Sequence, residues 1–228
     1  MSCIYVRGMP SKGPEDWKKL HPKLHWKKGR SARALAYSWE DNPRDFPKKI
    51  RNVLDNSGFP WENTRPLIII PEHEVNLPGR GRSSTNDVFV LANADGALVS
   101  IMVEGKVDEG FAEPVSNWSN GTVNRERRLK GICNLLNLKL DQIQDISYQV
   151  LHRSASAVIE AKRLRAPLAL MIVQSFDNNT PQSDFDKFSE FVSLFDMQAN
   201  DDEIIPVGTN DVKLHVSWIK GDSTFLNK

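Results

Sequence analysis

The chain has 228 residues, a formal net charge of +1 and a mean hydropathy of −0.45, values that are ordinary for a globular protein. No stretch approaches the roughly 20 apolar residues that span a bilayer, and the N-terminus lacks an apolar run of signal-peptide length, so we expect a cytoplasmic protein without a membrane partner. Its two cysteines are too few for a disulfide framework or a cysteine-rich zinc site.

Positive charge is concentrated at the N-terminal end. Residues 1–51 contain 13 Lys and Arg against 5 Asp and Glu, which favours an anionic partner for this part, the alternative being a solvated lysine-rich surface. The length suits one well-buried core. We therefore expect a single domain over 1–228, with an irregular basic segment at 1–30, a core at 31–176 and a C-terminal helix and strand at 177–228.

Helices are predicted before the first strands. The sequence SARALAYSWE at 31–40 places its apolar residues on one helical stripe, with Ser31 as the N-cap, and a second helix is predicted over about 45–54. The β-branched run LIII at 67–70 is typical of a buried strand. A polar loop rich in Gly, Arg and Ser follows at 77–86.

A hairpin is clearly signalled after this loop. The strand-like runs DVFVLAN (87–93) and ALVSIMVEGKV (97–107) flank Asp95-Gly96, and this dipeptide suits a type I′ turn because both central residues need positive φ. A two-residue loop places Asp87 opposite Glu104. A four-residue loop would keep both carboxylates on one face, whereas an odd loop would separate them.

Lys106 follows two residues after Glu104 and therefore shares its face of the strand. The opposite face carries Val99, Ile101 and Val103, which we expect to point into the core. Two carboxylates and one amine are thus expected to converge at one end of a buried hairpin.

Helices and strands alternate in the rest of the chain. Predicted helices lie at 124–136, 146–165 and about 183–195, and predicted strands lie at 168–176 and about 212–219. The uniformly apolar run before Asp177 is typical of a strand covered on both faces. Helices on both sides of a strand cluster predict an α/β or α+β fold, in which a central mixed sheet contains an antiparallel hairpin.

The pairing of Asp87 with Glu104 has a chemical interpretation. Two carboxylates suit a hard divalent cation such as Mg²⁺ or Mn²⁺, bound through oxygens, and such an ion can activate water and stabilise charge on a phosphate. Lys106 could position or deprotonate that water, or stabilise the pentavalent phosphorus. The alternative is a Glu–Lys pair on the solvent side of a strand, because E-x-K alone is a weak motif.

The pattern N-D-x(16)-E-G-K on two adjacent strands, with helices on either side, resembles the PD-(D/E)XK nuclease superfamily, which has the restriction-endonuclease-like fold. That family has an α-β-β-β-α-β core, and the order of the elements predicted over 31–176 is the same. The terminal parts also resemble those of an uncharacterised bacterial family. One departure is Asn86, which stands where the motif name has proline.

The resemblance implies roles for individual residues. Asp87 and Glu104 would be metal ligands, with the Gly105 carbonyl as a third ligand, and Lys106 would be the catalytic lysine. The family often adds an acidic residue on the first helix and a polar residue on the later helix, here Glu40 and Gln149. The implied activity is hydrolysis of phosphodiester bonds by a DNA endonuclease-like enzyme that requires Mg²⁺ or Mn²⁺.

Basic side chains near these elements are candidate phosphate contacts. They comprise two arginines of the Gly-rich loop and three residues of the N-terminal segment, namely Arg80, Arg82, Lys27, Lys28 and Arg30. For the loop the alternative is a solvated, flexible segment, and the near-neutral net charge argues against tight non-specific DNA binding. The expected partner is nucleic acid, in particular DNA, and a homodimer is left open.

Other polar residues that could belong to a site are interpreted as structural or as exposed to solvent. The basic run at 125–130 is interpreted as a solvated helix face, and His152 and Arg153 are interpreted as structural residues. The triplet EHE at 72–74 cannot direct all three side chains to one ion on an extended segment, although its two acidic residues could share a face.

Three hypotheses follow. The first is a metal-dependent nuclease acting on DNA, and the second is a catalytically inactive module of the same fold that binds nucleic acid or a protein partner. The third is an unrelated α/β protein in which Glu104 and Lys106 form a surface pair. The intact set of Asp87, Glu104 and Lys106 favours the enzyme, because binding alone would not require all three residues.

Overall fold

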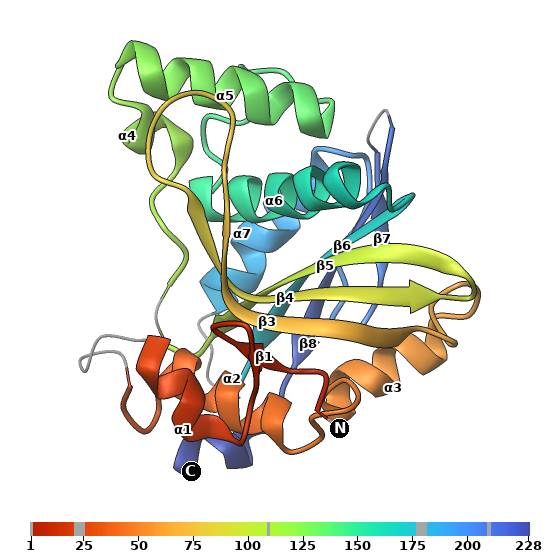
Figure 1. Ribbon diagram of the computed structural model, residues 1–228. Coiled ribbons are helices and arrows are strands. Elements are labelled where there is room, and N and C mark those ends of the chain that lie inside the picture. Colours follow the sequence, from red (N-terminus) through yellow and green to blue (C-terminus); the bar gives the residue numbers. More distant parts are fainter. Residues whose placement is uncertain (1, 21–25, 109, 177–181, 209–210) are drawn as a thin grey trace.

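The computed structural model describes residues 2–20, 26–108, 110–176, 182–208 and 211–228. Six strands form one mixed sheet in the order β3-β4-β5-β6-β8-β7, which runs through the centre of the molecule (Figure 1). The strands are β3 (Arg65–Val75), β4 (Ser84–Ala94), β5 (Ala97–Lys106), β6 (Leu168–Ser175), β7 (Ile205–Val207) and β8 (Lys213–Lys220). This arrangement confirms the mixed α/β fold class predicted from the sequence.

The remaining elements precede, interrupt or follow the strands of this sheet. Before it come β1 (Tyr5–Val6), β2 (Met9–Pro10), α1 (Pro14–Trp17), the 3-10 helix η1 (Lys18–Leu20), α2 (Ser31–Glu40) and α3 (Lys48–Asn56). Between β5 and β6 come α4 (Val115–Ser119), α5 (Val123–Leu136) and α6 (Tyr148–Leu164). Helix α7 (Gln182–Ser193) follows β6, and the 3-10 helix η2 (Ser223–Asn227) follows β8.

The β4–β5 hairpin has the predicted register. Ala94 pairs with Ala97 and Val88 pairs with Val103, so the connection is the two-residue turn Asp95-Gly96. Both turn residues have positive φ, 51° and 88° respectively, as a type I′ turn requires. The same register determines which side chains share a face at the far end of the hairpin.

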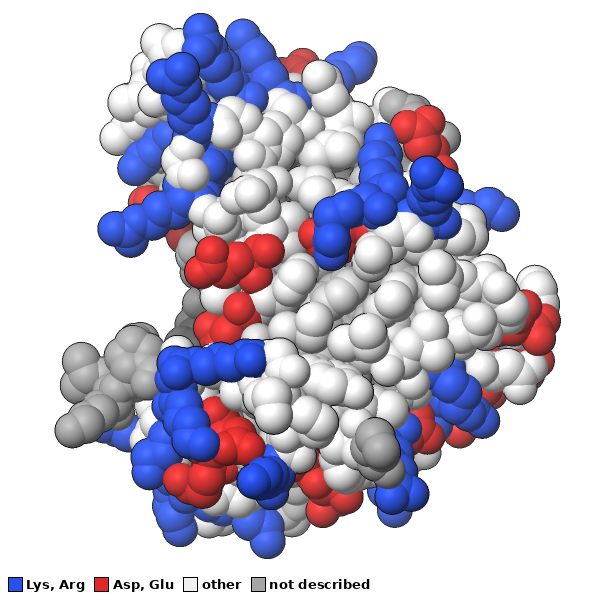
Figure 2. All heavy atoms as spheres, viewed as in Figure 1, with Lys and Arg blue, Asp and Glu red and all other residues white. Residues whose placement is uncertain are grey.

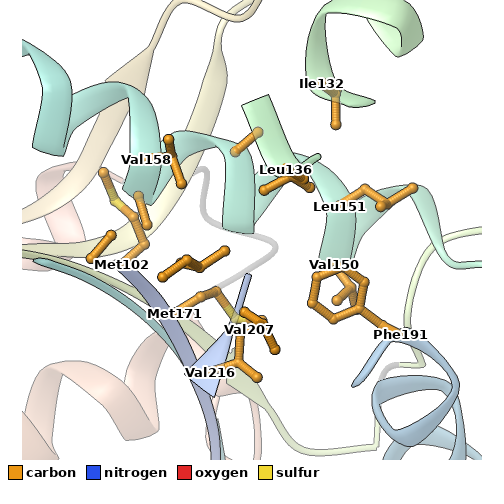
Figure 3. Close-up of a cluster of buried hydrophobic side chains, with 14 of the residues drawn as sticks. Met102, Ile132, Leu136, Val150, Leu151, Val158, Met171, Phe191, Val207 and Val216 are labelled. Atoms are coloured by element: carbon orange, nitrogen blue, oxygen red, sulfur yellow. The ribbon is translucent and has the colours of Figure 1, made fainter. Parts of the chain in front are cut away.

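Helices α6 and α7 cover one face of the sheet, and α5 packs on α6 (Figure 1). Figure 3 shows how their apolar side chains meet those of the strands in one buried cluster, which includes Met102, Leu151, Met171, Phe191 and Val216. The β5 side chains on this face therefore point into a packed layer between sheet and helices. A surface Glu–Lys pair would require a strand with one face in solvent. Strand β5 does not have such a face.

Helices α2 and α3 cover the opposite face. Val99 and Ile101 of β5 pack there against a second apolar cluster that includes Leu35 and Trp39, as expected for the alternate residues of this strand. Gly105 lets α2 approach closely, because a Cβ at Gly105 would lie 2.4 Å from Leu35 Cδ1. The glycine between Glu104 and Lys106 thus has a packing role of its own.

The structure differs from the predictions at the edges of elements. Strand β3 is longer than the run at 67–70 and forms one edge of the sheet, so Leu67 and Ile68 are 46% and 39% exposed rather than buried. Helix α3 begins at Lys48 because Pro47 is its N-cap, and proline disfavours helical backbone in the residue before it. Strand β7 was not predicted, since three residues carry no recognisable period.

The N-terminal segment contains more regular structure than predicted. Strands β1 and β2 pair with each other, and Ile4 is fully buried and forms a bridge to Ile69 of β3. Within the described part of the chain, none of the helices has the length and apolar character needed to span a bilayer.

Candidate active site

The end of the β4–β5 hairpin brings together the three residues predicted to lie there. Glu104 and Lys106 alternate along β5 on the α6 side of the sheet and are only 4% and 2% exposed. Lys106 Nζ lies 3.3 Å from Glu104 Oε1. Asp87 lies beside them on β4, where its Oδ2 accepts a hydrogen bond from the Gly105 backbone N–H at 2.8 Å. Glu104 and Lys106 therefore form a buried pair next to a second carboxylate.

Helix α6 adds Gln149 and Arg153 to this cluster. The two residues are one helical turn apart, at i and i+4, so both side chains face the sheet. Gln149 Nε2 donates to Glu104 Oε1 at 2.5 Å, and Gln149 Oε1 accepts from Lys106 Nζ at 2.9 Å. Gln149 thus links the carboxylate to the amine, and it is the polar residue of the later helix for which the resemblance implies an accessory role.

Arg153, interpreted from the sequence as a structural residue, is a cation that faces both carboxylates. Arg153 Nε donates to Glu104 Oε2 at 2.5 Å, and its Nη2 lies 3.9 Å from Asp87 Oδ1. The guanidinium also donates to Ser84 Oγ at 2.9 Å and to the Thr85 carbonyl. It therefore supplies positive charge between the carboxylates. The four-residue spacing from Gln149 is the signal that could have identified it.

Glu72 contributes a third carboxylate, which was considered from the sequence only as part of the triplet at 72–74. The register of β3 and β4 places Glu72 across from Asp87. Its φ is +52°, an uncommon value for a residue with a side chain and one that breaks the alternation assumed for 72–74. Burial, and then repulsion by Asp87, raises the pKa of Glu72 to about 8. Glu74, its expected partner on one face, is exposed.

Asp87 is also electrostatically perturbed. Burial, and then repulsion by Glu104, raises the pKa of Asp87 to about 7. Its side chain is 26% exposed, against 6% for Glu104 and 10% for Arg153, so a small ligand can reach Asp87 first. A bound cation favours the deprotonated forms of crowded carboxyl groups. The carboxylate oxygens of this cluster are therefore the kind of ligand that a hard divalent cation prefers.

The carboxylates are not arranged as a ready-made coordination sphere. Across the described residues, no group of three or more His, Cys, Asp or Glu side chains is placed to hold a metal ion. Both oxygens of Glu104 already accept hydrogen bonds. An ion held by Asp87, Glu104 and the Gly105 carbonyl would therefore compete with Arg153 for Glu104.

Glu40 is not joined to the cluster, which corrects its expected accessory role. Its Oε1 accepts hydrogen bonds from Trp17 Nε1 at 2.7 Å and from the Ser11 hydroxyl. The physical reason is that α2 packs on the face of the sheet opposite Glu104. Glu40 instead fastens the N-terminal segment to α2.

The five residues predicted to contact phosphate are all exposed, namely Arg80, Arg82, Lys27, Lys28 and Arg30. The first two belong to the β3–β4 loop beside α5. The other three precede α2, where Arg30 Nη1 lies 3.2 Å from Asp108 Oδ1, just beyond the end of β5. Figure 2 shows basic side chains on both sides of a notch that carries acidic ones.

The basic run at 125–130 divides between two environments. Arg125 and Arg128 line a cavity beside the β3–β4 loop, whereas Arg127 and Lys130 are exposed. The expectation of a solvated helix face is therefore correct for only half of the run.

Similarity to known proteins extends over nearly the whole chain. Residues 10–223 match one family model, a domain of unknown function (DUF6946). No curated protein and no solved structure matches the chain. Because the family model covers the hairpin and α6 as well as most other elements, the protein belongs to the DUF6946 family.

Proposed function

We propose that this protein hydrolyses phosphodiester bonds in nucleic acid, with DNA as the first candidate substrate, in a metal-dependent reaction centred on Asp87, Glu104 and Lys106. The observation that carries the proposal is the burial of Lys106 against Glu104 and Gln149, beside Asp87. Lysine is almost never buried unless it is paired. A buried lysine and two carboxylates at the end of a hairpin form a costly arrangement that a purely structural role does not require.

We further propose that the chain is a member of the PD-(D/E)XK nuclease superfamily. Support comes from the order α2, β3, β4, β5, α6, β6, in which β3, β4 and β5 are antiparallel and β6 is parallel to β5. This order corresponds to the α-β-β-β-α-β core of that superfamily. The positions of Asp87 on β4 and of Glu104 and Lys106 on β5 also support it.

The side chains have separable roles in this proposal. Asp87, Glu104 and the Gly105 carbonyl would hold Mg²⁺ or Mn²⁺, which supplies an activated water and stabilises charge on the phosphate. Lys106, held by Gln149, donates toward the attacking water or a phosphate oxygen. Once Glu104 is released, the guanidinium of Arg153 is free to donate to a phosphate oxygen.

The test is a cleavage assay on linear, supercoiled and single-stranded DNA, and on RNA, with Mg²⁺ or Mn²⁺. Asp87→Asn and Glu104→Gln should abolish cleavage by weakening ion binding, because they remove charge while preserving shape. Lys106→Ala should abolish turnover with the ion still bound. Ca²⁺ should bind but support little cleavage, because its coordination is looser.

Matched controls keep the assay interpretable. Lys162→Ala and Asp211→Asn alter an exposed ion pair on α6 and in a loop, and both should cut like wild type. If Lys106→Ala cuts as well as wild type, the activity does not come from this cluster and the proposal is wrong.

A second candidate is a catalytically inactive module that binds nucleic acid or a protein. The observation that favours it is the ion pair between Arg153 and Glu104, which compensates the buried carboxylate with the chain's own residues. A wild-type protein that binds DNA and divalent ions but cuts none of the four substrates would support this candidate over the enzyme.

A further inference from the structure

A second polar site lies next to the carboxylate cluster. A cavity of about 490 Å³ opens between the β3–β4 loop, α4 and the first turns of α5 and α6. Four arginines line it, Arg80, Arg82, Arg125 and Arg128, and among the described residues no Asp or Glu does. Such a concentration of one charge in a concave site attracts an anion.

The four guanidinium groups differ in their partners from those arginines of the fold that pair with a carboxylate. Within the described ranges, none of them forms an ion pair with a carboxylate. Arg128 is only 8% exposed, and its Nε has no hydrogen-bond partner in the described part of the chain, while its Nη1 donates to the Arg82 carbonyl at 2.9 Å. A buried guanidinium with an unused donor is costly, and the Arg128 side chain that carries this cost lines the cavity.

The β3–β4 loop is shaped to close over Arg128. Gly81 has φ +137°, and a Cβ there would lie 2.8 Å from Arg128 Nη2. Gly79 has φ +80°, and its Cβ would lie 3.3 Å from the Arg128 backbone nitrogen. Only glycine combines these backbone angles with such close approach, so this wall of the cavity is a built feature rather than a loose surface loop.

The first turn of α5 adds donors to the same cavity. The helix has 14 residues, and its N-cap, Thr122, makes no side-chain capping hydrogen bond. Thr122 and Asn124 both line the cavity. Backbone N–H groups at a helix N-terminus, together with the helix dipole, favour a bound anion.

The cavity shares a wall with the candidate active site. Ser84 Oγ accepts from Arg153 Nη1 at 2.9 Å and lies 2.9 Å from His152 Nδ1. Ser84 and His152 line the cavity, while Arg153 holds Glu104 on the other side. A ligand in the cavity would therefore lie against Ser84, which contacts Arg153 of the carboxylate cluster.

We infer that this cavity binds a phosphate monoester, carried either by the end of a nucleic acid strand or by a free nucleotide. Arginine forks bind phosphate oxygens in pairs. A monoester carries about −1.5 to −2 charges at neutral pH, which suits a cavity lined by four arginines better than the single charge of a backbone diester does. The inference does not depend on cleavage at Asp87 and Glu104. If cleavage occurs, the bound group is the phosphate at a strand end.

Calorimetric titration of the full chain tests this inference. The titrants are two single-stranded oligonucleotides that differ only in a 5′-phosphate, and AMP with adenosine as its matched pair. In at least one pair, the phosphorylated form should bind at least about tenfold more tightly, as expected for charge-assisted hydrogen bonds. Preference within the oligonucleotide pair alone indicates a strand end, and preference within the AMP pair indicates a nucleotide. No preference in either pair would overturn the inference.

Variants locate the binding and separate this inference from the proposed function. The double variant Arg80→Ala/Arg82→Ala changes two exposed side chains and should lose the preference for the phosphorylated form. Arg127→Ala, on the same helix as Arg125 and Arg128 but outside the cavity lining, should keep it. Asp87→Asn should also keep it, so failure of cleavage leaves this result standing. An equal loss in Arg127→Ala would show non-specific attraction and contradict the inference.

Discussion

Arg153 is the residue on which the charge balance of the cluster depends. Its guanidinium contacts Glu104 directly and lies 3.9 Å from Asp87. Glu104 is almost completely buried, and breaking a buried pair by removing one partner leaves an uncompensated charge. Arg153 therefore contributes to folding whether or not it also meets a substrate.

Substitution of this arginine has a measurable consequence. Arg153→Met keeps the aliphatic stem but removes the charge, and it should lower the free energy of unfolding by about 3–5 kcal/mol. Lys162→Met on the same helix breaks an exposed pair with Asp211, and should cost less than about 1 kcal/mol. Urea unfolding measures both. Equal losses of unfolding free energy in the two variants would show that the buried Arg153–Glu104 pair stabilises the fold no more than the exposed pair does.

Glu72 and Asp87 predict how stability depends on pH. Their pKa values are about 8 and about 7 in the folded chain, against 4.5 and 3.8 ordinarily. The native state therefore binds more protons than the unfolded state between about pH 5 and pH 8, so stability should fall as pH rises through that window. Thermal unfolding followed across it should show a flatter slope for Glu72→Gln and Asp87→Asn. An unchanged slope in both variants would contradict the assigned pKa values.

At the scale of elements, the contact between α2 and β5 depends on Gly105. A methyl group at this position would lie 2.4 Å from Leu35 Cδ1, so helix or strand must shift to admit it. Overpacking of this kind costs about 1–3 kcal/mol. The shift would also move Glu104 and Lys106, the neighbours of Gly105 on the strand.

A double-mutant cycle tests this contact. Gly105→Ala alone should be destabilising, and Leu35→Ala in the same chain should recover part of the loss, because the clash is removed. Gly208→Ala, where an added Cβ meets nothing within 4 Å, is the matched control and should be nearly neutral. Strictly additive effects of Gly105→Ala and Leu35→Ala would show that the two residues do not restrain each other.

Most elements could be predicted from the sequence because their signals are local. The Asp95-Gly96 turn set the hairpin register, and a periodic apolar stripe indicated the helix at 31–40. The length of β3 and the existence of β7 depend instead on which strand each pairs with. That information lies in tertiary contacts rather than in local pattern.

The candidate site was only partly predictable for the same reason. The shared location of Asp87, Glu104 and Lys106 could be predicted from the register of the hairpin strands. Arg153 was not placed, because the four-residue spacing from Gln149 was its one signal, and such a spacing does not by itself reveal which sheet residues a helix faces. Glu72 was expected at most to share a face with Glu74. Its position beside Asp87 was not predicted, because its positive φ breaks the alternation on which strand predictions rest.

At the scale of the whole molecule, the distribution of charge predicts how nucleic acid would bind. Lys27, Lys28 and Arg30 lie near the same end of β5 as the carboxylate cluster, whereas Lys213 lies at the opposite end of the sheet. If the three residues bind phosphates, alanine at all three should reduce the slope of log affinity against log salt by roughly 0.9 for each phosphate that is no longer neutralised. Lys213→Ala should leave the slope unchanged. Fluorescence anisotropy with labelled duplex DNA measures it, and equal slopes for all proteins would exclude a role for these side chains in phosphate binding.

The measurement that tests the central claim most directly is anomalous X-ray scattering from crystals soaked in Mn²⁺. We expect one strong peak in contact with both Asp87 and Glu104, with the Arg153 guanidinium moved off Glu104. The peak should be absent from crystals of Asp87→Asn and present in those of Lys106→Ala. A wild-type crystal in which Arg153 still binds Glu104, with no peak between the carboxylates, would contradict a metal-dependent active site at this position.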